Sequence, residues 1–228
     1  MKLPMHNAQA IVFDLDGTLV DTEDMWALAT KQMLIARGIC YTDKLKKRIH
    51  TAVHGLPPLQ ACTLLKELVA LKETPEQLAT EKKERAFTLM KGNIHYIPGA
   101  YAFIKAVIAA NINIAIATNC STEIVALIMD ECPELSQFFQ EHIYTPQHVG
   151  NRPKPHPAIY QHATRMLNVL PEKSIAIEDS AHGMQSAKNA GLFCIGLNRN
   201  GTEDQLPKAD IVVQNYEQIL LKKKIIVR

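Results

Sequence analysis

Residues 11–23 read IVFDLDGTLVDTE, and this stretch decides the fold. It begins as an apolar run of strand-forming residues and ends in a cluster of acidic residues: Asp14, Asp16, Asp21 and Glu23. Side chains alternate along a strand, so Asp14 and Asp16 start on the same side of it. Two like charges that close together raise one pKa or attract a cation, and oxygen donors favour Mg²⁺.

Two other interpretations of this acidic cluster are weaker. A calcium-binding loop that starts at Asp14 would need a glycine at its sixth position and a glutamate at its twelfth, where Leu19 and Met25 stand instead. A purely structural turn, in which Gly17 supplies a positive φ, explains the cluster only if it stands alone. The rest of the chain therefore decides whether it carries chemistry.

Further apolar runs predict more strands, at residues 112–117, 174–177, 193–197 and 211–213, with a weaker candidate at 141–144. Helical patterns lie between them, at residues 100–110, 121–131, 156–168 and 181–190. Strands that alternate with helices predict an α/β fold: a doubly wound, mainly parallel sheet with helices on both faces. Ligands of such sheets bind beyond the carboxyl ends of the strands.

The connection after the first strand is much longer than the others. About 95 residues separate Asp16 from Ile112, where a simple crossover needs only about a dozen. Helical periodicity begins at Trp26, and the leucines at positions 64, 65, 68 and 71 mark a second helix after Pro57-Pro58. Thr74-Pro75 is typical of an N-cap followed by the first residue of a third helix. We therefore predict a core domain of residues 1–19 and 97–228, interrupted by an all-helical domain of residues 20–96. Within it, Asp21 and Glu23 are expected to begin the first helix rather than to carry chemistry.

Polar residues also follow other predicted strands. Thr118 and Asn119 come after the second strand and directly before a helix, a position that suits an anion. Lys154 stands between prolines in NRPKPHP, which holds a cation on a stiff backbone. Glu178 and Asp179 end a further strand. Each feature alone is typical of a turn or a helix cap, but together they predict one site at one edge of the sheet.

These segments resemble the four motifs of the haloacid dehalogenase-like (HAD) superfamily. The matching residues are DLDGTLVDTE at 14–23, Thr118-Asn119, Lys154-Pro155, and Glu178-Asp179-Ser180 with Gly183. The helical insert resembles that of subfamily I, the β-phosphoglucomutase-like group. The resemblance covers about residues 10–213 and implies a Rossmann-like core with an inserted cap domain.

The resemblance also implies a phosphatase that works through an aspartyl-phosphate intermediate. Asp14 would be the nucleophile and Asp16 the general acid and base. Lys154 would offset charge and orient Asp14. The implied cofactor is Mg²⁺, held by Asp14, the backbone carbonyl of Asp16 and Asp179, with Glu178 in support through water.

The implied substrate is a small phosphorylated metabolite. Thr118 and Asn119, together with Gly17 of the first motif, would bind the phosphoryl group. His54, in a loop of the insert, is a further candidate for substrate contact. Because this loop is nearly neutral, we expect a sugar, polyol or nucleoside monophosphate.

A hexose-phosphate mutase of the β-phosphoglucomutase type is the main alternative. In the family pattern those enzymes carry a hinge histidine where this chain has Trp26, and a cap arginine where it has Pro58. Both departures favour simple hydrolysis. Dehalogenases of the family lack the second aspartate, so Asp16 argues against that activity. A more distant alternative is a catalytically silent regulatory protein that binds phosphate and Mg²⁺.

The composition narrows the possible partners. The 228 residues are 47% hydrophobic and 21% charged, which is ordinary for a globular protein. Lys and Arg number 25 against 23 Asp and Glu, so the charge balance predicts neither a nucleic-acid nor a membrane partner. Five scattered cysteines without a CxxC pair, and no signal-peptide pattern, predict a cytoplasmic protein with reduced thiols. We infer no obligatory protein partner.

Overall fold

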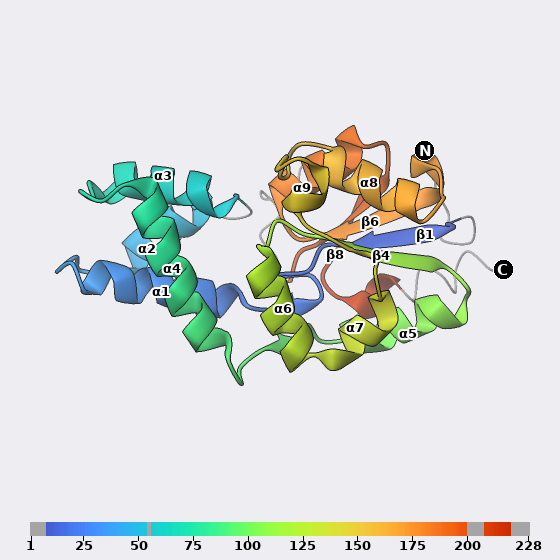
Figure 1. The fold of residues 1–228 in the computed structure, drawn as a ribbon, viewed down its shortest axis with the longest axis horizontal. Coiled ribbons are helices and arrows are strands. Elements are labelled where there is room, and N and C mark those ends of the chain that lie inside the picture. The colour runs from blue at the N-terminus through green and yellow to red at the C-terminus, as the bar shows by residue number, and fades with distance from the viewer. Residues whose placement is uncertain (1–7, 54–55, 200–207, 220–228) are drawn as a thin grey trace. The chain divides into compact units, whose positions relative to one another are not determined.

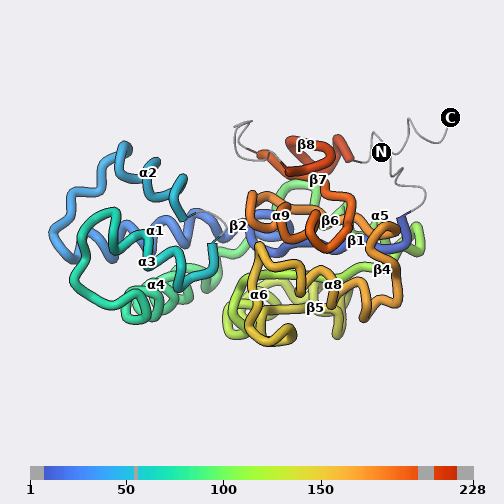
Figure 2. Tube along the Cα trace, turned by 90° about the horizontal axis from the view of Figure 1, so that it is seen from above, coloured from blue at the N-terminus to red at the C-terminus, as the bar shows by residue number. Residues whose placement is uncertain are grey.

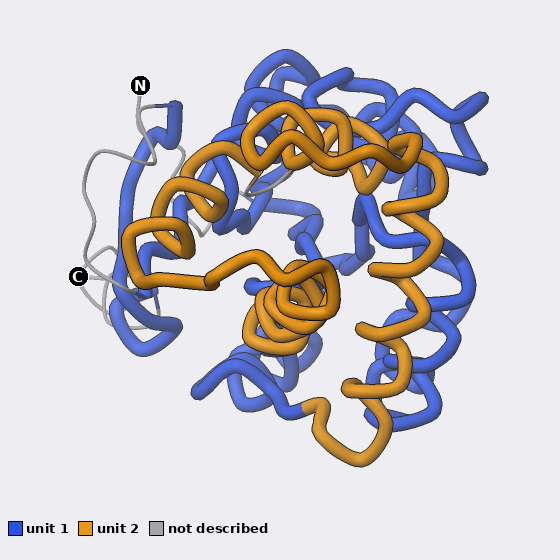
Figure 3. The backbone as a smooth tube through the Cα atoms, turned by 90° about the vertical axis from the view of Figure 1, so that its left-hand side faces the viewer, with its two compact units in different colours: residues 1–21, 95–228 blue, residues 22–94 orange. Residues whose placement is uncertain are grey.

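The structure is a computed structural model that describes residues 8–53, 56–199 and 208–219. The chain divides into two compact units (Figure 3). The core unit comprises residues 1–21 and 95–228, and the helical unit comprises residues 22–94. The role of the helical unit as a cap, with the predicted boundaries at residues 20 and 96, stays a prediction.

The core unit is built on a six-stranded parallel sheet with strand order β5-β4-β1-β6-β7-β8 (Figures 1 and 2). Its strands are β1 (Ala10–Phe13), β4 (Asn113–Ala117), β5 (Ile143–Tyr144), β6 (Ser174–Glu178), β7 (Phe193–Leu197) and β8 (Ile211–Val213). The central strand β1 pairs in parallel with β4 on one side and with β6 on the other. The predicted α/β fold with a mainly parallel sheet is confirmed.

Helices cover both faces of this sheet (Figure 1). One face carries α8 (Ala158–Met166) and α9 (Ala181–Asn189), and the other carries α5 (Ala100–Ala109), α6 (Thr122–Glu131) and α7 (Pro133–Phe139). Two short 3₁₀ helices, η2 (Pro146–Val149) and η3 (Pro171–Lys173), lie in the connections before α8 and β6. Every residue of β1 is buried, because this strand is covered on both faces.

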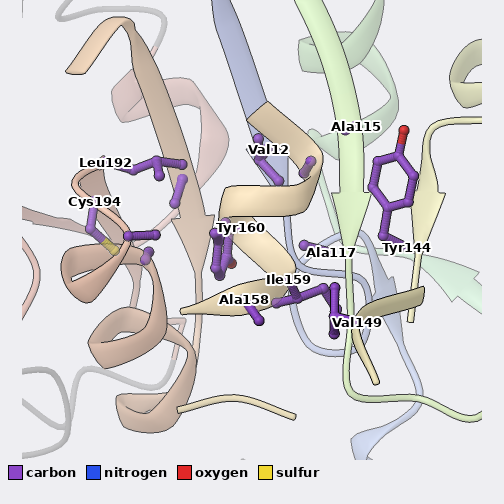
Figure 4. Packing of buried hydrophobic residues seen from close by; sticks show 14 of the residues in the cluster. Val12, Ala115, Ala117, Tyr144, Val149, Ala158, Ile159, Tyr160, Leu192 and Cys194 are labelled. Atoms are coloured by element: carbon purple, nitrogen blue, oxygen red, sulfur yellow. The ribbon is translucent and has the colours of Figure 1, made fainter. Parts of the chain in front are cut away.

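Successive side chains of β1 point to opposite faces of the sheet, so the strand packs against both helical layers. Val12 belongs to a buried cluster that includes Ala115 of β4 and Tyr160 of α8 (Figure 4). The next residue, Phe13, makes edge-on contacts with Phe103 of α5 and Phe139 of α7 on the opposite face. The apolar run in the quoted stretch therefore stabilises two packing layers at once.

The helical unit contains α1 (Glu23–Ile35), α2 (Asp43–Val53), α3 (Pro58–Val69) and α4 (Pro75–Met90). The helices α1, α3 and α4 are those that the sequence predicts. Helix α2 was not predicted, because Ile49 is its one buried residue and most of the others are polar. Helix α7 was not predicted either, because its seven residues are too few to reveal a helical period. Within the described ranges, we find no helix with the length and apolar character needed to cross a bilayer.

Two short strands lie where the chain leaves and re-enters the core unit. Here β2 (Val20–Asp21) pairs antiparallel with β3 (His95–Tyr96). Glu23 begins α1 as predicted, but the expectation for Asp21 is wrong. Asp21 belongs to β2, and its Oδ2 accepts a hydrogen bond of 2.8 Å from Arg199 Nη1, a residue that follows β7.

Thr74 caps α4, as predicted, in a reciprocal arrangement with Gln77. Thr74 Oγ1 accepts from the Gln77 N–H at 3.3 Å, and Gln77 Oε1 accepts from the Thr74 N–H at 2.9 Å.

We expect Thr74→Ala to lower the free energy of unfolding by about 1 kcal/mol, measured by urea denaturation. The control is Thr88→Ala, which removes a hydroxyl from the last turn of the same helix. Equal losses in the two variants would contradict the capping role.

Candidate active site

The predicted site residues meet at the carboxyl edge of the sheet. Asp14 follows β1, Thr118 follows β4, and Glu178 ends β6. Phe13 is paired with Ile116 on one side and Ile177 on the other, so the three strands end at nearly the same level. Because β4 and β6 lie on opposite sides of β1, this edge is the topological switch point where such sheets bind ligands.

Lys154 reaches this edge from the segment between η2 and α8. Its Nζ donates to Asp14 Oδ1 and to Glu178 Oε1, each at 2.5 Å. The Lys154 side chain is only 2% exposed, so both ion pairs are shielded from solvent. Burial alone would lower the pKa of Lys154, but the two carboxylates together raise it above its usual range. The lysine therefore stays charged between two acidic groups.

Asn119 holds the backbone of Lys154. Its Oδ1 accepts from the Lys154 N–H at 2.9 Å, and its Nδ2 donates to the Lys154 carbonyl oxygen at 3.3 Å. Both ends of the amide are thus bonded to a residue 35 positions later in the chain. The sequence predicts a phosphate contact for Asn119 and carries no signal of these two hydrogen bonds. The phosphate contact stays a prediction.

Two hydroxyl groups lie in the segment between β4 and α6. Thr118 Oγ1 is buried and accepts from the Cys120 N–H at 3.1 Å, which leaves the hydroxyl hydrogen as a donor. Ser121 Oγ, at the N-cap of α6, is buried and has no hydrogen-bond partner among the described residues. Hydroxyl donors at a helix N-terminus suit an anion, so Ser121 joins Thr118 as a candidate phosphate ligand.

Gly17 permits the tight turn after Asp14. Its φ is +83°, and its N–H donates to the Val20 carbonyl oxygen at 2.8 Å. A Cβ at this position would collide with the carboxylate of Asp179, so the glycine also lets Asp179 approach. Since the N–H is used in the turn, the predicted phosphate contact of Gly17 stays a prediction.

An acidic cluster at this edge can hold a metal ion. Oxygens of Asp14, Glu178 and Asp179 lie within 4.8 Å of one another. Burial raises the pKa of the Asp14 carboxyl; Lys154 opposes this effect, while Glu178 and Asp16 add to it. Three carboxylates thus lie beside Lys154, so the acidic groups of the cluster outnumber this lysine. An all-oxygen donor set with this charge fits Mg²⁺.

Asp16 and His54 complete the predicted set. Asp16 is half-buried in the turn after Asp14, where it bridges to Val20. Its carboxylate is not one of the three in the acidic cluster, and its predicted metal contact is through the backbone carbonyl. His54 lies outside the described residues, so its substrate contact stays a prediction. Trp26 is half-buried on α1, with Lys82 Nζ of α4 5.6 Å from its ring centroid, which supports a packing role.

Tyr160 also contacts the site, although the sequence does not predict it there. This residue of α8 is fully buried, and its hydroxyl donates to Glu178 Oε1 at 2.7 Å. The spacing of Tyr160 in its helix is that of an ordinary core residue, and six positions separate it from Lys154. Its link to the site depends on α8 packing against β1 and β4, which local sequence patterns do not reveal.

A parallel sheet with acidic, basic and hydroxyl groups gathered at its switch point defines an α/β enzyme. A family model described as haloacid dehalogenase-like hydrolase matches residues 11–197. The chain therefore belongs to the haloacid dehalogenase-like hydrolase family, and the resemblance noted in the sequence is confirmed.

Known proteins of this family resemble the chain over most of its length. A phosphorylated carbohydrates phosphatase of Thermotoga maritima is 33% identical over 188 residues, covering 81% of this chain and 82% of that protein. The crystal structure of a HAD family hydrolase from Deinococcus radiodurans R1 with bound phosphate and sodium has a TM-score of 0.74 and 28% identity, and covers 94% of each chain. A β-phosphoglucomutase from Clostridium difficile has a TM-score of 0.75 and 25% identity, and covers 97% of this chain and 100% of that one.

Proposed function

We propose that this protein is a Mg²⁺-dependent phosphatase that hydrolyses a small phosphorylated metabolite: a sugar, a polyol or a nucleoside monophosphate. The observation that carries the proposal is the buried Asp14, which accepts from Lys154 Nζ at 2.5 Å beside an acidic cluster at the switch point of the sheet. The phosphatase named for phosphorylated carbohydrates supports this substrate class. Five free cysteines support a cytoplasmic location.

The first half of the reaction is transfer of the phosphoryl group to Asp14. An oxygen of Asp14 attacks phosphorus, the bond from phosphorus to the ester oxygen breaks, and Asp16 gives a proton to that leaving oxygen. Thr118 holds the phosphoryl group, while Lys154 offsets the charge beside Asp14. Asn119 contributes by fixing the backbone of Lys154. The product is an aspartyl-phosphate.

The second half is hydrolysis of this intermediate. Asp16, now ionised, takes a proton from a water molecule, whose oxygen attacks phosphorus. The bond between phosphorus and Asp14 breaks, which releases inorganic phosphate and restores the carboxylate. Asp14, Asp179 and the backbone carbonyl of Asp16 would hold Mg²⁺, with Glu178 in support. When bound, the ion supplies neutralisation of charge on the phosphoryl oxygens.

We infer that the helical unit serves as a cap that excludes bulk water during the reaction. The chain enters this unit directly after β2 and leaves it directly before β3. These two strands pair with each other, so the two connections start from one short antiparallel pair. Small-angle scattering with and without a phosphate analogue tests the inference. Identical scattering curves in both states would count against closure.

Mutase activity is the second candidate, favoured by the structural likeness to a β-phosphoglucomutase. The residues that the family pattern requires for it are replaced by Trp26 and by Pro58, which begins α3. A mutase would interconvert hexose phosphates and depend on a bisphosphate activator. A phosphatase releases inorganic phosphate from a monophosphate without one.

Removal of the metal gives the first test of the proposal. We expect p-nitrophenyl phosphate to be hydrolysed in Mg²⁺, with turnover lowered about 100-fold or more by excess EDTA and restored by added Mg²⁺. A panel of sugar, polyol and nucleoside monophosphates then identifies the substrate by release of inorganic phosphate. If no ester in the panel is hydrolysed while calorimetry detects binding of Mg²⁺ and phosphate, the phosphatase proposal fails and the regulatory alternative is favoured.

A further inference from the structure

Tyr160 contacts two charged residues of the site, Glu178 and the buried Lys154. Its hydroxyl donates to Glu178 Oε1 at 2.7 Å, and Lys154 Nζ lies 5.1 Å from the centroid of its ring. The residue is fully buried, and Figure 4 shows it in the packed cluster with Val12 of β1. A cation so close to an aromatic ring is attracted by it. Tyr160 therefore forms one wall of the position that Lys154 occupies.

Both carboxylate oxygens of Glu178 accept hydrogen bonds from the protein. Oε1 accepts from Lys154 Nζ and the Tyr160 hydroxyl, and Oε2 accepts from the N–H and the hydroxyl of Ser180, at 3.4 and 3.2 Å. These four donors engage both oxygens of the carboxylate. A Cβ at Gly183 would collide with this carboxylate, which shows how closely α9 fits around it. In this arrangement Glu178 accepts from Lys154 with the same oxygen that accepts from Tyr160.

Lys154 is shared between two carboxylates that compete for it. Its Nζ lies 2.5 Å from both Asp14 Oδ1 and Glu178 Oε1. The Tyr160 hydroxyl donates to the same oxygen of Glu178 that holds the lysine. A hydrogen bond to an ionised oxygen disperses its negative charge, so it weakens the attraction of that oxygen for the ammonium. Asp14 Oδ1 therefore keeps its own hydrogen bond from Lys154 Nζ.

We propose that Tyr160 is a positioning residue that sets how Lys154 is shared between Asp14 and Glu178. It acts through these two neighbours and not by contact with the substrate. The inference rests on the proposed phosphatase function in so far as its effect is measured in turnover. A structural measurement tests it separately.

The test is Tyr160→Phe, which removes the hydroxyl and keeps the ring beside Lys154. We expect kcat to fall about tenfold, with KM and the Mg²⁺ half-saturation concentration changed by less than about twofold. The matched control is Tyr144→Phe: Tyr144 is also buried, on β5, and its hydroxyl is bonded to His142 Nδ1 at 2.9 Å. We expect the control to keep the wild-type kcat and both variants to have similar melting temperatures.

A crystal structure of Tyr160→Phe provides the second readout. We expect Lys154 Nζ to stay bonded to Glu178 and to move out of hydrogen-bonding distance of Asp14. An inactive wild type would refute the phosphatase function, and this structure would still decide the positioning role. If the wild type is active, the inference is refuted when Tyr160→Phe keeps the wild-type kcat and the contact between Lys154 and Asp14. It is also refuted when kcat, KM and the melting temperature of the variant all change together. A variant that does not fold also overturns it, because the hydroxyl would then serve stability.

Discussion

Replacing Asp14 with asparagine is expected to abolish hydrolysis of phosphate esters while the fold is retained. The amide has nearly the shape of the carboxylate but is a poor nucleophile, so no aspartyl-phosphate forms. We expect kcat to fall by about 10³-fold or more, as is usual when a nucleophile is removed. The measurement is turnover of p-nitrophenyl phosphate in Mg²⁺, with circular dichroism to verify folding.

A matched control separates this effect from a general change of charge. Asp24, in the first turn of α1, is exposed, and Asp24→Asn should keep the wild-type kcat. Rapid acid quenching of the wild type during turnover, followed by mass spectrometry, should detect one phosphoryl group on the peptide that contains Asp14. If Asp14→Asn retains turnover within about tenfold of the wild type, the covalent mechanism is wrong, because residual activity of this size does not need the nucleophile.

The fold could be predicted where each element carries its own signal. The run AIVF of β1 is buried throughout, and Thr74-Pro75 marks the start of α4 by local chemistry alone. The polar helix α2 carried no such signal, because it buries little more than Ile49. Asp21 was misassigned for a related reason: its place in β2 depends on pairing with His95, which local sequence does not specify.

The same distinction holds for the site. Asp14 and Glu178 could be predicted to lie together because both stand at strand ends, and parallel strands bring such positions to one edge. The contacts of Asn119 and Tyr160 could not, because each links residues of different elements through tertiary packing. Tyr216 is a further case: its hydroxyl donates to the Thr18 carbonyl oxygen at 2.9 Å, from 198 positions later in the chain. It thereby supports the turn after Asp14.

Replacing Lys154 with methionine is expected to destabilise the protein as well as inactivate it. Methionine nearly fills the volume of the lysine but leaves Asp14 and Glu178 buried without their cation. We expect the free energy of unfolding to fall by about 3–5 kcal/mol, the usual cost of removing one partner of a buried ion pair. Urea denaturation in EDTA measures the loss without interference from a bound metal.

An exposed ion pair of the same chain is the matched control for this prediction. Lys188 Nζ lies 2.7 Å from Asp210 Oδ1, but the two side chains are 35% and 28% exposed. We expect Lys188→Met to lower the free energy of unfolding by about 1 kcal/mol or less, because water and salt already screen the pair. Added Mg²⁺ should restore part of the stability of Lys154→Met and none of that of Lys188→Met, since the ion supplies a cation to the acidic cluster. Equal losses at both lysines, with no effect of Mg²⁺, would mean that burial adds nothing to the Lys154 pairs and that the acidic cluster does not bind the ion.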